Sequence, residues 1–78
     1  SNIEVYPNPT SQYINFTNLN KAEKIEILTM QGQLMSVWED DGPTAKIDLT
    51  NLPESVYFAK ITNSFGDYLI RRIVKSNQ

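Results

Sequence analysis

The chain has 78 residues, a net charge of −2, and neither cysteine nor histidine. This length allows one domain, and a domain of this size buries only about 60% of the surface that its unfolded chain exposes, which leaves no room for a deep substrate cavity. The missing cysteines exclude disulfides and thiolate sites, and the missing histidines remove the commonest general base and metal ligand.

Charge is distributed unevenly along the chain. Residues 1–56 carry three lysines against eight acids, a net of −5, whereas residues 57–78 carry four cations against Asp67, a net of +3. The overall balance provides no basic field that would attract nucleic acid. Two interpretations of the C-terminal cations stay open: gatekeeper charges on a solvated strand edge, or a docking strand for an acidic partner.

The first half of the chain is a series of short runs of alternating polarity, which predict β-strands. The run at residues 5–6 ends at Pro7, Asn8 and Pro9, where two prolines fix φ and exclude helix, so a rigid bend is expected. Gly32 can take a positive φ and is expected to close a hairpin. The further strands predicted in this half are 13–17, 24–29 and 34–38.

The second half opens with an acidic loop at 39–43 that contains a glycine and a proline. Its carboxylates suggest calcium, but they lack the alternating spacing of a calcium loop, and ordinary solvated acids are the stronger interpretation. Strands are predicted at 45–49, 56–62 and 68–75. The run at 56–62 is apolar on both faces, as in the central strand of a sandwich.

These elements predict an all-β fold, a small antiparallel two-sheet sandwich of about seven strands, Ig-like in its size and in the spacing of its turns. We expect a single domain over residues 1–78, with a structured core over about 3–75, cut from a larger secreted protein whose signal peptide lies upstream, because none is visible at the start. No stretch approaches the about 20 apolar residues that a membrane span needs. The predicted core residues are Phe16, Ile25, Ile27, Trp38, Leu52, Tyr57, Phe58 and Ile61.

A search for chemistry predicts no enzyme and no catalytic, cofactor-binding or metal-binding residue. Serines and threonines occur without a histidine or cysteine to activate them, the acids fall in loops or on outward positions, and the three glycines stand singly. One alternative is a carbohydrate- or surface-binding module that stacks sugars on exposed rings, and another is a purely structural spacer. The rings available for stacking are Tyr6, Tyr13, Trp38, Phe65 and Tyr68.

Four blocks, taken in order, carry a resemblance to a known family. They are Val-Tyr-Pro-Asn-Pro-Thr at 5–10 with Tyr-Ile-Asn-Phe at 13–16, the hairpin at 25–34, the segment at 47–61 and Arg-Arg-Ile-Val-Lys at 71–75. Together they resemble the type A C-terminal sorting domain of the type IX, or Por, secretion system of Bacteroidetes. The resemblance covers residues 3–75, nearly the whole chain.

The resemblance implies a seven-stranded Ig-like domain without catalysis, located at the C-terminus of cargo that reaches the periplasm by a signal peptide. The implied partners are the upstream cargo domain, the outer-membrane export machinery and a sortase-like cysteine peptidase that removes the domain. The cargo then stays on the cell surface or enters the medium. A weak homodimer through an edge strand is a further expectation, and no nucleic acid is implied.

Each matched residue has either a recognition role or only a role in building the fold. The implied recognition candidates are Pro7, Asn8, Pro9, Gly32, Arg71, Arg72, Val74 and Lys75. The basic residues would decorate the last strand, where export information is thought to lie. Ser55 stands where the family usually has glycine, at a cost of about 1 kcal/mol if that position needs a positive φ. The hairpin has Met30 and Gln31 where the family often has an aspartate before Gly-Lys.

Overall fold

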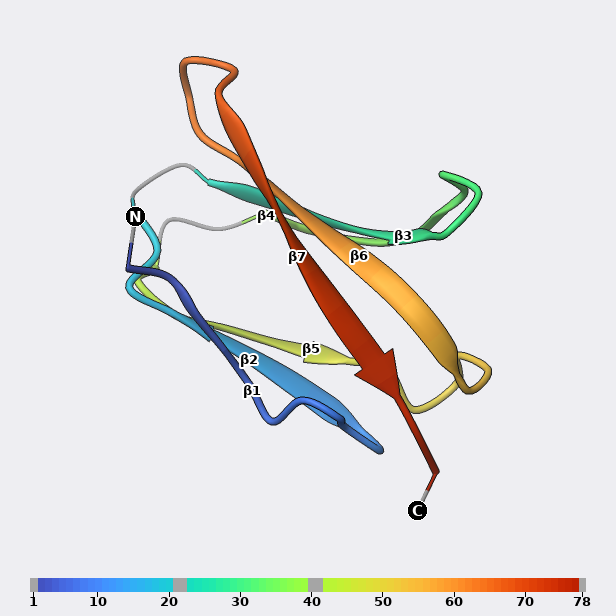
Figure 1. The fold of residues 1–78 in the computed structure, drawn as a ribbon. Coiled ribbons are helices and arrows are strands. Elements are labelled where there is room, and N and C mark those ends of the chain that lie inside the picture. The colour runs from blue at the N-terminus through green and yellow to red at the C-terminus, as the bar shows by residue number, and fades with distance from the viewer. Residues whose placement is uncertain (1, 21–22, 40–41, 78) are drawn as a thin grey trace.

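The computed structural model describes residues 2–20, 23–39 and 42–77, which form seven strands and no helix (Figure 1). The strands are β1 (Glu4–Tyr6), β2 (Tyr13–Thr17), β3 (Lys24–Thr29), β4 (Leu34–Glu39), β5 (Ala45–Asp48), β6 (Ser55–Thr62) and β7 (Tyr68–Lys75). They pair antiparallel into a three-stranded sheet, β1-β2-β5, and a four-stranded sheet, β4-β3-β6-β7. The predicted sandwich and its seven strands are confirmed. Within the described ranges no segment is a helix that could cross a membrane.

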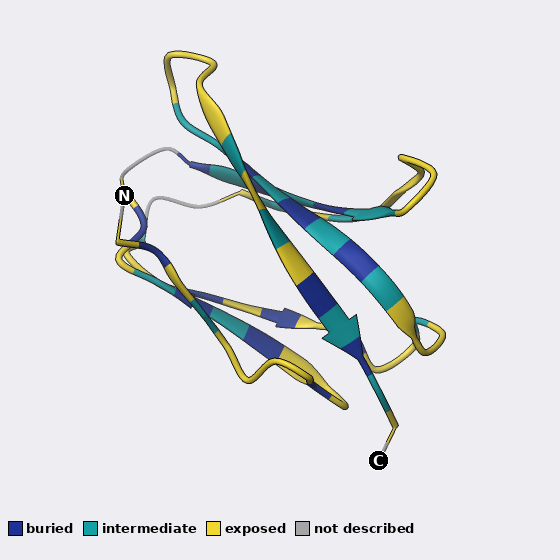
Figure 2. Cartoon of the chain, in the orientation of Figure 1, coloured by how far each residue is buried: buried dark blue, intermediate teal, exposed yellow. Residues whose placement is uncertain are grey.

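The core lies between the two sheets because alternate residues of each strand face inward. On β6 the buried side chains are Tyr57, Ala59 and Ile61, and the residues between them are only half-buried, a striping visible in Figure 2. β6 lies between β3 and β7, as its apolar character predicted. The buried apolar residues are Ile3, Ile14, Phe16, Leu19, Ile25, Ile27, Ala45, Ile47, Leu49, Tyr57, Ala59, Ile61 and Ile73.

Most of the predicted core residues occupy this layer, but one prediction was wrong. Phe58 is half-buried on the outer face of the four-stranded sheet, opposite Leu28 on one side and Arg72 on the other. Its neighbours Tyr57 and Ala59 take the inward positions, so the period of two forces Phe58 outward. Trp38 and Leu52, which were also predicted as core residues, are partly buried and pack against the buried layer.

Positive φ angles occur where the turns require them. Gly32 has φ 88° in the turn that joins β3 to β4, and its amide donates to the Thr29 carbonyl at 2.9 Å. Among the described residues, Asn18 at φ 61° is the non-glycine residue with a positive φ. Ser55 therefore has ordinary extended dihedrals at the start of β6, and the replacement of the family's usual glycine causes no backbone strain.

Tyr57 fastens the loop before β6 to the core. Its hydroxyl donates a hydrogen bond of 2.7 Å to the carbonyl of Pro53, four residues earlier, while its ring is only 3% exposed. This is the geometry of the tyrosine corner of Ig-like sandwiches. The same loop places Leu52 against the core and presents its carbonyl to the end of β7.

Replacing Tyr57 with phenylalanine removes only this hydrogen bond, because the ring is retained. We expect Tyr57→Phe to lower the free energy of unfolding by about 1 kcal/mol. The matched control is Tyr68→Phe, since Tyr68 is 61% exposed; its effect should stay below about 0.5 kcal/mol. Urea denaturation followed by tryptophan fluorescence measures both, and equal losses in the two variants would contradict the assigned role.

Candidate recognition surface

A segment near the start of the chain runs along the outer edge of β7. Residues 7–10, which we call the N-terminal bend, lie against the C-terminal half of this strand. The Asn8 side chain makes a two-point contact there: Nδ2 donates to the Arg72 carbonyl at 2.8 Å, and Oδ1 accepts from the Val74 amide at 2.9 Å. A single carboxamide therefore satisfies one acceptor and one donor of the strand edge, as a neighbouring strand would.

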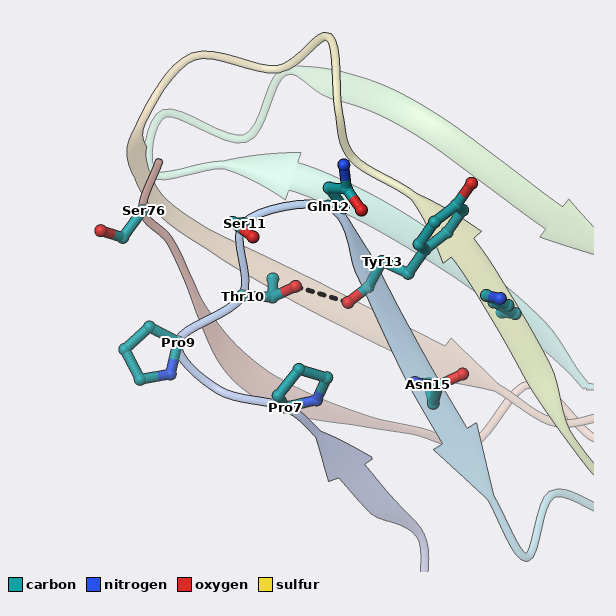
Figure 3. A pocket seen from close by; sticks show the side chains of 9 residues that line it. Pro7, Pro9, Thr10, Ser11, Gln12, Tyr13, Asn15 and Ser76 are labelled. Carbon is teal, nitrogen blue, oxygen red and sulfur yellow. Dashed lines mark hydrogen bonds between the residues drawn. The ribbon is translucent and has the colours of Figure 1, made fainter. Parts of the chain in front are cut away.

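Thr10 continues this pairing with its backbone. Its amide donates to the Val74 carbonyl at 2.9 Å, and its carbonyl accepts from the Ser76 amide at 2.8 Å, which forms a parallel bridge beside Lys75. Its hydroxyl donates to the Tyr13 carbonyl at the start of β2 (Figure 3). Thr10, 3% exposed, thus links β2 of one sheet to β7 of the other.

The predicted basic residues of β7 lie in three different environments. Arg72 is exposed on the outer face, and Arg71 is half-buried on the inward side. Lys75 does not decorate the surface, because the alternation turns it inward and leaves it 2% exposed. Its ammonium group donates to the Leu52 carbonyl at 3.0 Å and to the Asn77 side chain at 2.8 Å, so it anchors the end of the strand.

The structure therefore brings together seven of the eight predicted recognition residues. Three of them, Pro7, Asn8 and Pro9, belong to the bend. The other four belong to β7, the strand that the bend contacts: Arg71, Arg72, Val74 and Lys75. Gly32 lies apart from them, in the turn between β3 and β4 (Figure 1). Sequence reasoning missed Thr10, which is small and polar and has no apolar pattern to reveal its burial.

Beside the bend, the surface is hollowed over about 520 Å³ (Figure 3). The hollow is lined by Pro7, Pro9, Thr10, Ser11, Gln12, Tyr13, Asn15, Lys46 and Ser76. The Lys46 ammonium lies 4.3 Å from the centre of the Tyr13 ring, a cation–π contact that covers one face of the ring. Asp48 pairs with Tyr13 across the strands, and hydrogen bonds from the Thr50 hydroxyl and amide hold the pKa of its carboxyl below the usual value.

No cluster of histidine, cysteine, aspartate or glutamate that could hold a metal occurs among the described residues. The acidic loop considered for calcium includes Asp40 and Asp41, which lie outside the described residues. The described part of this surface consists of strand edge, bend and cationic side chains.

Comparison with known proteins shows the family of the chain. The sequence pattern of the family described as "Secretion system C-terminal sorting domain" matches residues 4–76. The chain belongs to this family. It is a C-terminal sorting domain of type IX secretion, a system that implies a Bacteroidetes source. The sorting domain has no significant match among curated proteins.

A solved structure is similar to the sorting domain in fold. It is PorZ, described as an essential bacterial surface component of the type IX secretion system of Porphyromonas gingivalis. The superposition has a TM-score of 0.85 at 16% sequence identity. It covers 96% of this chain and 11% of the PorZ chain, so the sorting domain spans a small part of that protein's length.

The Asn8 contact can be tested at the amide it binds. We expect Asn8→Ala to accelerate hydrogen exchange at the Val74 amide and to lower the free energy of unfolding by about 1 kcal/mol, since a donor and an acceptor of β7 lose their partner. Asn51→Ala, in the exposed loop before β6, is the matched control and should change stability by less than about 0.5 kcal/mol. Unchanged Val74 exchange in Asn8→Ala would show that the bend does not protect the strand.

Proposed function

We propose that this sorting domain is the export address of a larger cargo protein, recognised by the outer-membrane machinery of type IX secretion. A sortase-like cysteine peptidase then cleaves the chain upstream of the domain, and the cargo stays on the cell surface or enters the medium. The domain itself contributes no catalysis. Family membership supports the export role, and the joined surface of the N-terminal bend and β7 is the observation that carries the mode of recognition.

The same observation favours recognition of the folded domain over recognition of a loose C-terminal tail. The end of β7 is held at three points: Ser76 donates to Thr10, Lys75 donates to Leu52, and the Asn77 amide donates to the Glu54 carboxylate at 3.2 Å. A receptor that needed these residues in free, extended form would have to break all three contacts. A receptor that docks on the folded edge meets them already ordered, at a lower entropic cost.

A localisation assay tests this function directly. Residues 1–78 are fused behind a signal peptide and a fluorescent reporter, in a bacterium with an active type IX system and in its export-deficient mutant. We expect reporter on the surface or in the medium of the active strain only. Reporter held in the periplasm of both strains would contradict the export role.

Variants of the last strand then separate recognition from folding. Lys75→Met should destabilise the domain by about 1–3 kcal/mol, because it leaves the Leu52 carbonyl without its buried donor. Arg72→Met, on an exposed side chain, should leave stability nearly unchanged. A loss of export in Arg72→Met at unchanged stability therefore reports recognition, whereas a loss in Lys75→Met alone reports unfolding.

Carbohydrate or surface binding is the second candidate function, and the hollow beside Tyr13 is the observation that favours it. Tyr13 is 40% exposed there among polar side chains that include Gln12 and Asn15. Against it, Lys46 covers one face of the ring. Of the other exposed aromatics, Phe65 and Tyr68 belong to the β6–β7 hairpin and Tyr6 ends β1. Retention of the domain on a panel of polysaccharides, lost in Tyr13→Ala and kept in Tyr68→Ala, would establish this function; no retention on any of them would remove it.

A further inference from the structure

The edge of β7 is covered over only half of its length. The N-terminal bend occupies the edge from the Arg72 carbonyl to the Ser76 amide. Toward the turn with β6 the same edge continues through Tyr68 and Ile70, where no other strand of the described structure pairs with it. The β6–β7 hairpin projects beyond the rest of the fold at its turn, so this open stretch faces outward (Figure 1).

The register shows which backbone groups are free there. The bend binds the backbone of Arg72 and Val74, so the even-numbered residues of β7 direct their N–H and C=O groups away from β6. In an antiparallel pair this direction alternates with every residue. The amide of Ile70 and the amide of Arg72 therefore point to the open edge. The Ile70 carbonyl, which points the same way, receives only a long contact of 3.4 Å from the Arg71 guanidinium.

The side chains along this stretch are apolar and cationic. Tyr68 is 61% exposed and Ile70 is 43% exposed on the outer face, and Arg72 follows them there. The Lys60 ammonium lies 4.4 Å from the centre of the Tyr68 ring and adds another cation. The residues opposite Arg71 and Arg72 on β6 are Ala59 and Phe58, so no cross-strand carboxylate neutralises the two guanidinium groups.

We infer that the open edge of β7, from Tyr68 to Arg72, accepts an extended acidic-apolar segment of a partner protein as an additional strand of the four-stranded sheet. Free backbone groups supply the pairing, and alternate side chains supply the specificity, as in other cases of strand addition. An apolar residue of the partner lies opposite Ile70, and carboxylates lie beside Arg71 and Arg72.

A second copy of the chain is a poorer occupant of this edge. Two-fold pairing of β7 with itself would bring two strands of the same basic sequence side by side, each in the positive field of the other. Residues 57–78 carry a net charge of +3, which attracts an acidic segment and repels another copy. The inference rests on the proposed function, and the partner is the receptor that recognises the export address.

Proline substitution tests the backbone pairing with a control in the same sheet. Ile70→Pro removes an N–H that does not pair with β6, and proline is tolerated in that position of an edge strand. Val37→Pro is the matched control on β4 at the opposite edge. Val37 lies opposite Glu26 of β3, and the backbone groups of Glu26 point the other way, to Lys60 on β6. The Val37 amide therefore points away from β3, to an open edge. The Val37 side chain is 47% exposed.

Both variants are measured in the reporter fusion described above, with thermal unfolding of the purified domains as a check on folding. We expect Ile70→Pro to reduce exported reporter about tenfold or more, while Val37→Pro stays within about twofold of the original chain. Export of Ile70→Pro at the level of Val37→Pro overturns the inference. Failure of the unsubstituted fusion to be exported overturns the proposed function instead.

A charge series at an exposed position covers the case in which Ile70→Pro fails to fold. Arg72→Lys should keep export, and Arg72→Glu should abolish it, whereas Asn51→Glu in the exposed loop before β6 should have no effect. Equal export of Arg72→Glu and Asn51→Glu contradicts an acidic partner. A dimer of the purified domain in light scattering that disappears in Ile70→Pro also overturns the inference, because it assigns the edge to a second copy.

Discussion

Face-to-face burial of two small sheets is the constraint on which the rest of the structure depends. The chain has no cysteine and no histidine, so neither a disulfide nor a zinc site of the usual kind supplements its core. The inner layer is built from inward-facing residues such as Ile14, Phe16, Ile25, Ile27 and Ile61, each at most 2% exposed. Because burial of this layer fixes the register of every strand, it also determines which side chains lie on the outer faces of the two sheets.

The N-terminal bend turns this sandwich into a closed unit. Thr10 touches the first residue of β2 and the end of β7, which belong to different sheets, and Asn8 completes the edge of the latter. Segments more than 60 residues apart in the sequence therefore share one surface. In the proposed mode of recognition, a signal composed in this way exists only in the folded domain, so export requires folding of the domain.

Edge strands are normally protected against pairing with other chains by charges, covering segments or bulges. The sorting domain uses two of these devices on β7: the bend covers one half, and Arg71 and Arg72 flank the other. On the opposite edge, the pairing of β4 with β3 shifts register between Ile27 and Leu28 of β3. In the proposed strand addition, the cationic side chains that protect this open edge against aggregation also select an acidic partner strand.

The amino-acid sequence by itself determined the fold class, because strand periodicity and turn residues are local signals. The hairpin at Gly32, the central position of β6 and the family resemblance all came from such signals. Only the tertiary structure decided that Lys75 is buried, that Phe58 faces outward and that Asn8 completes the edge of β7. The physical reason is that burial and edge contacts depend on which face of each strand meets the other sheet and on contacts between segments far apart in the sequence. Neither is encoded in the spacing of neighbouring residues.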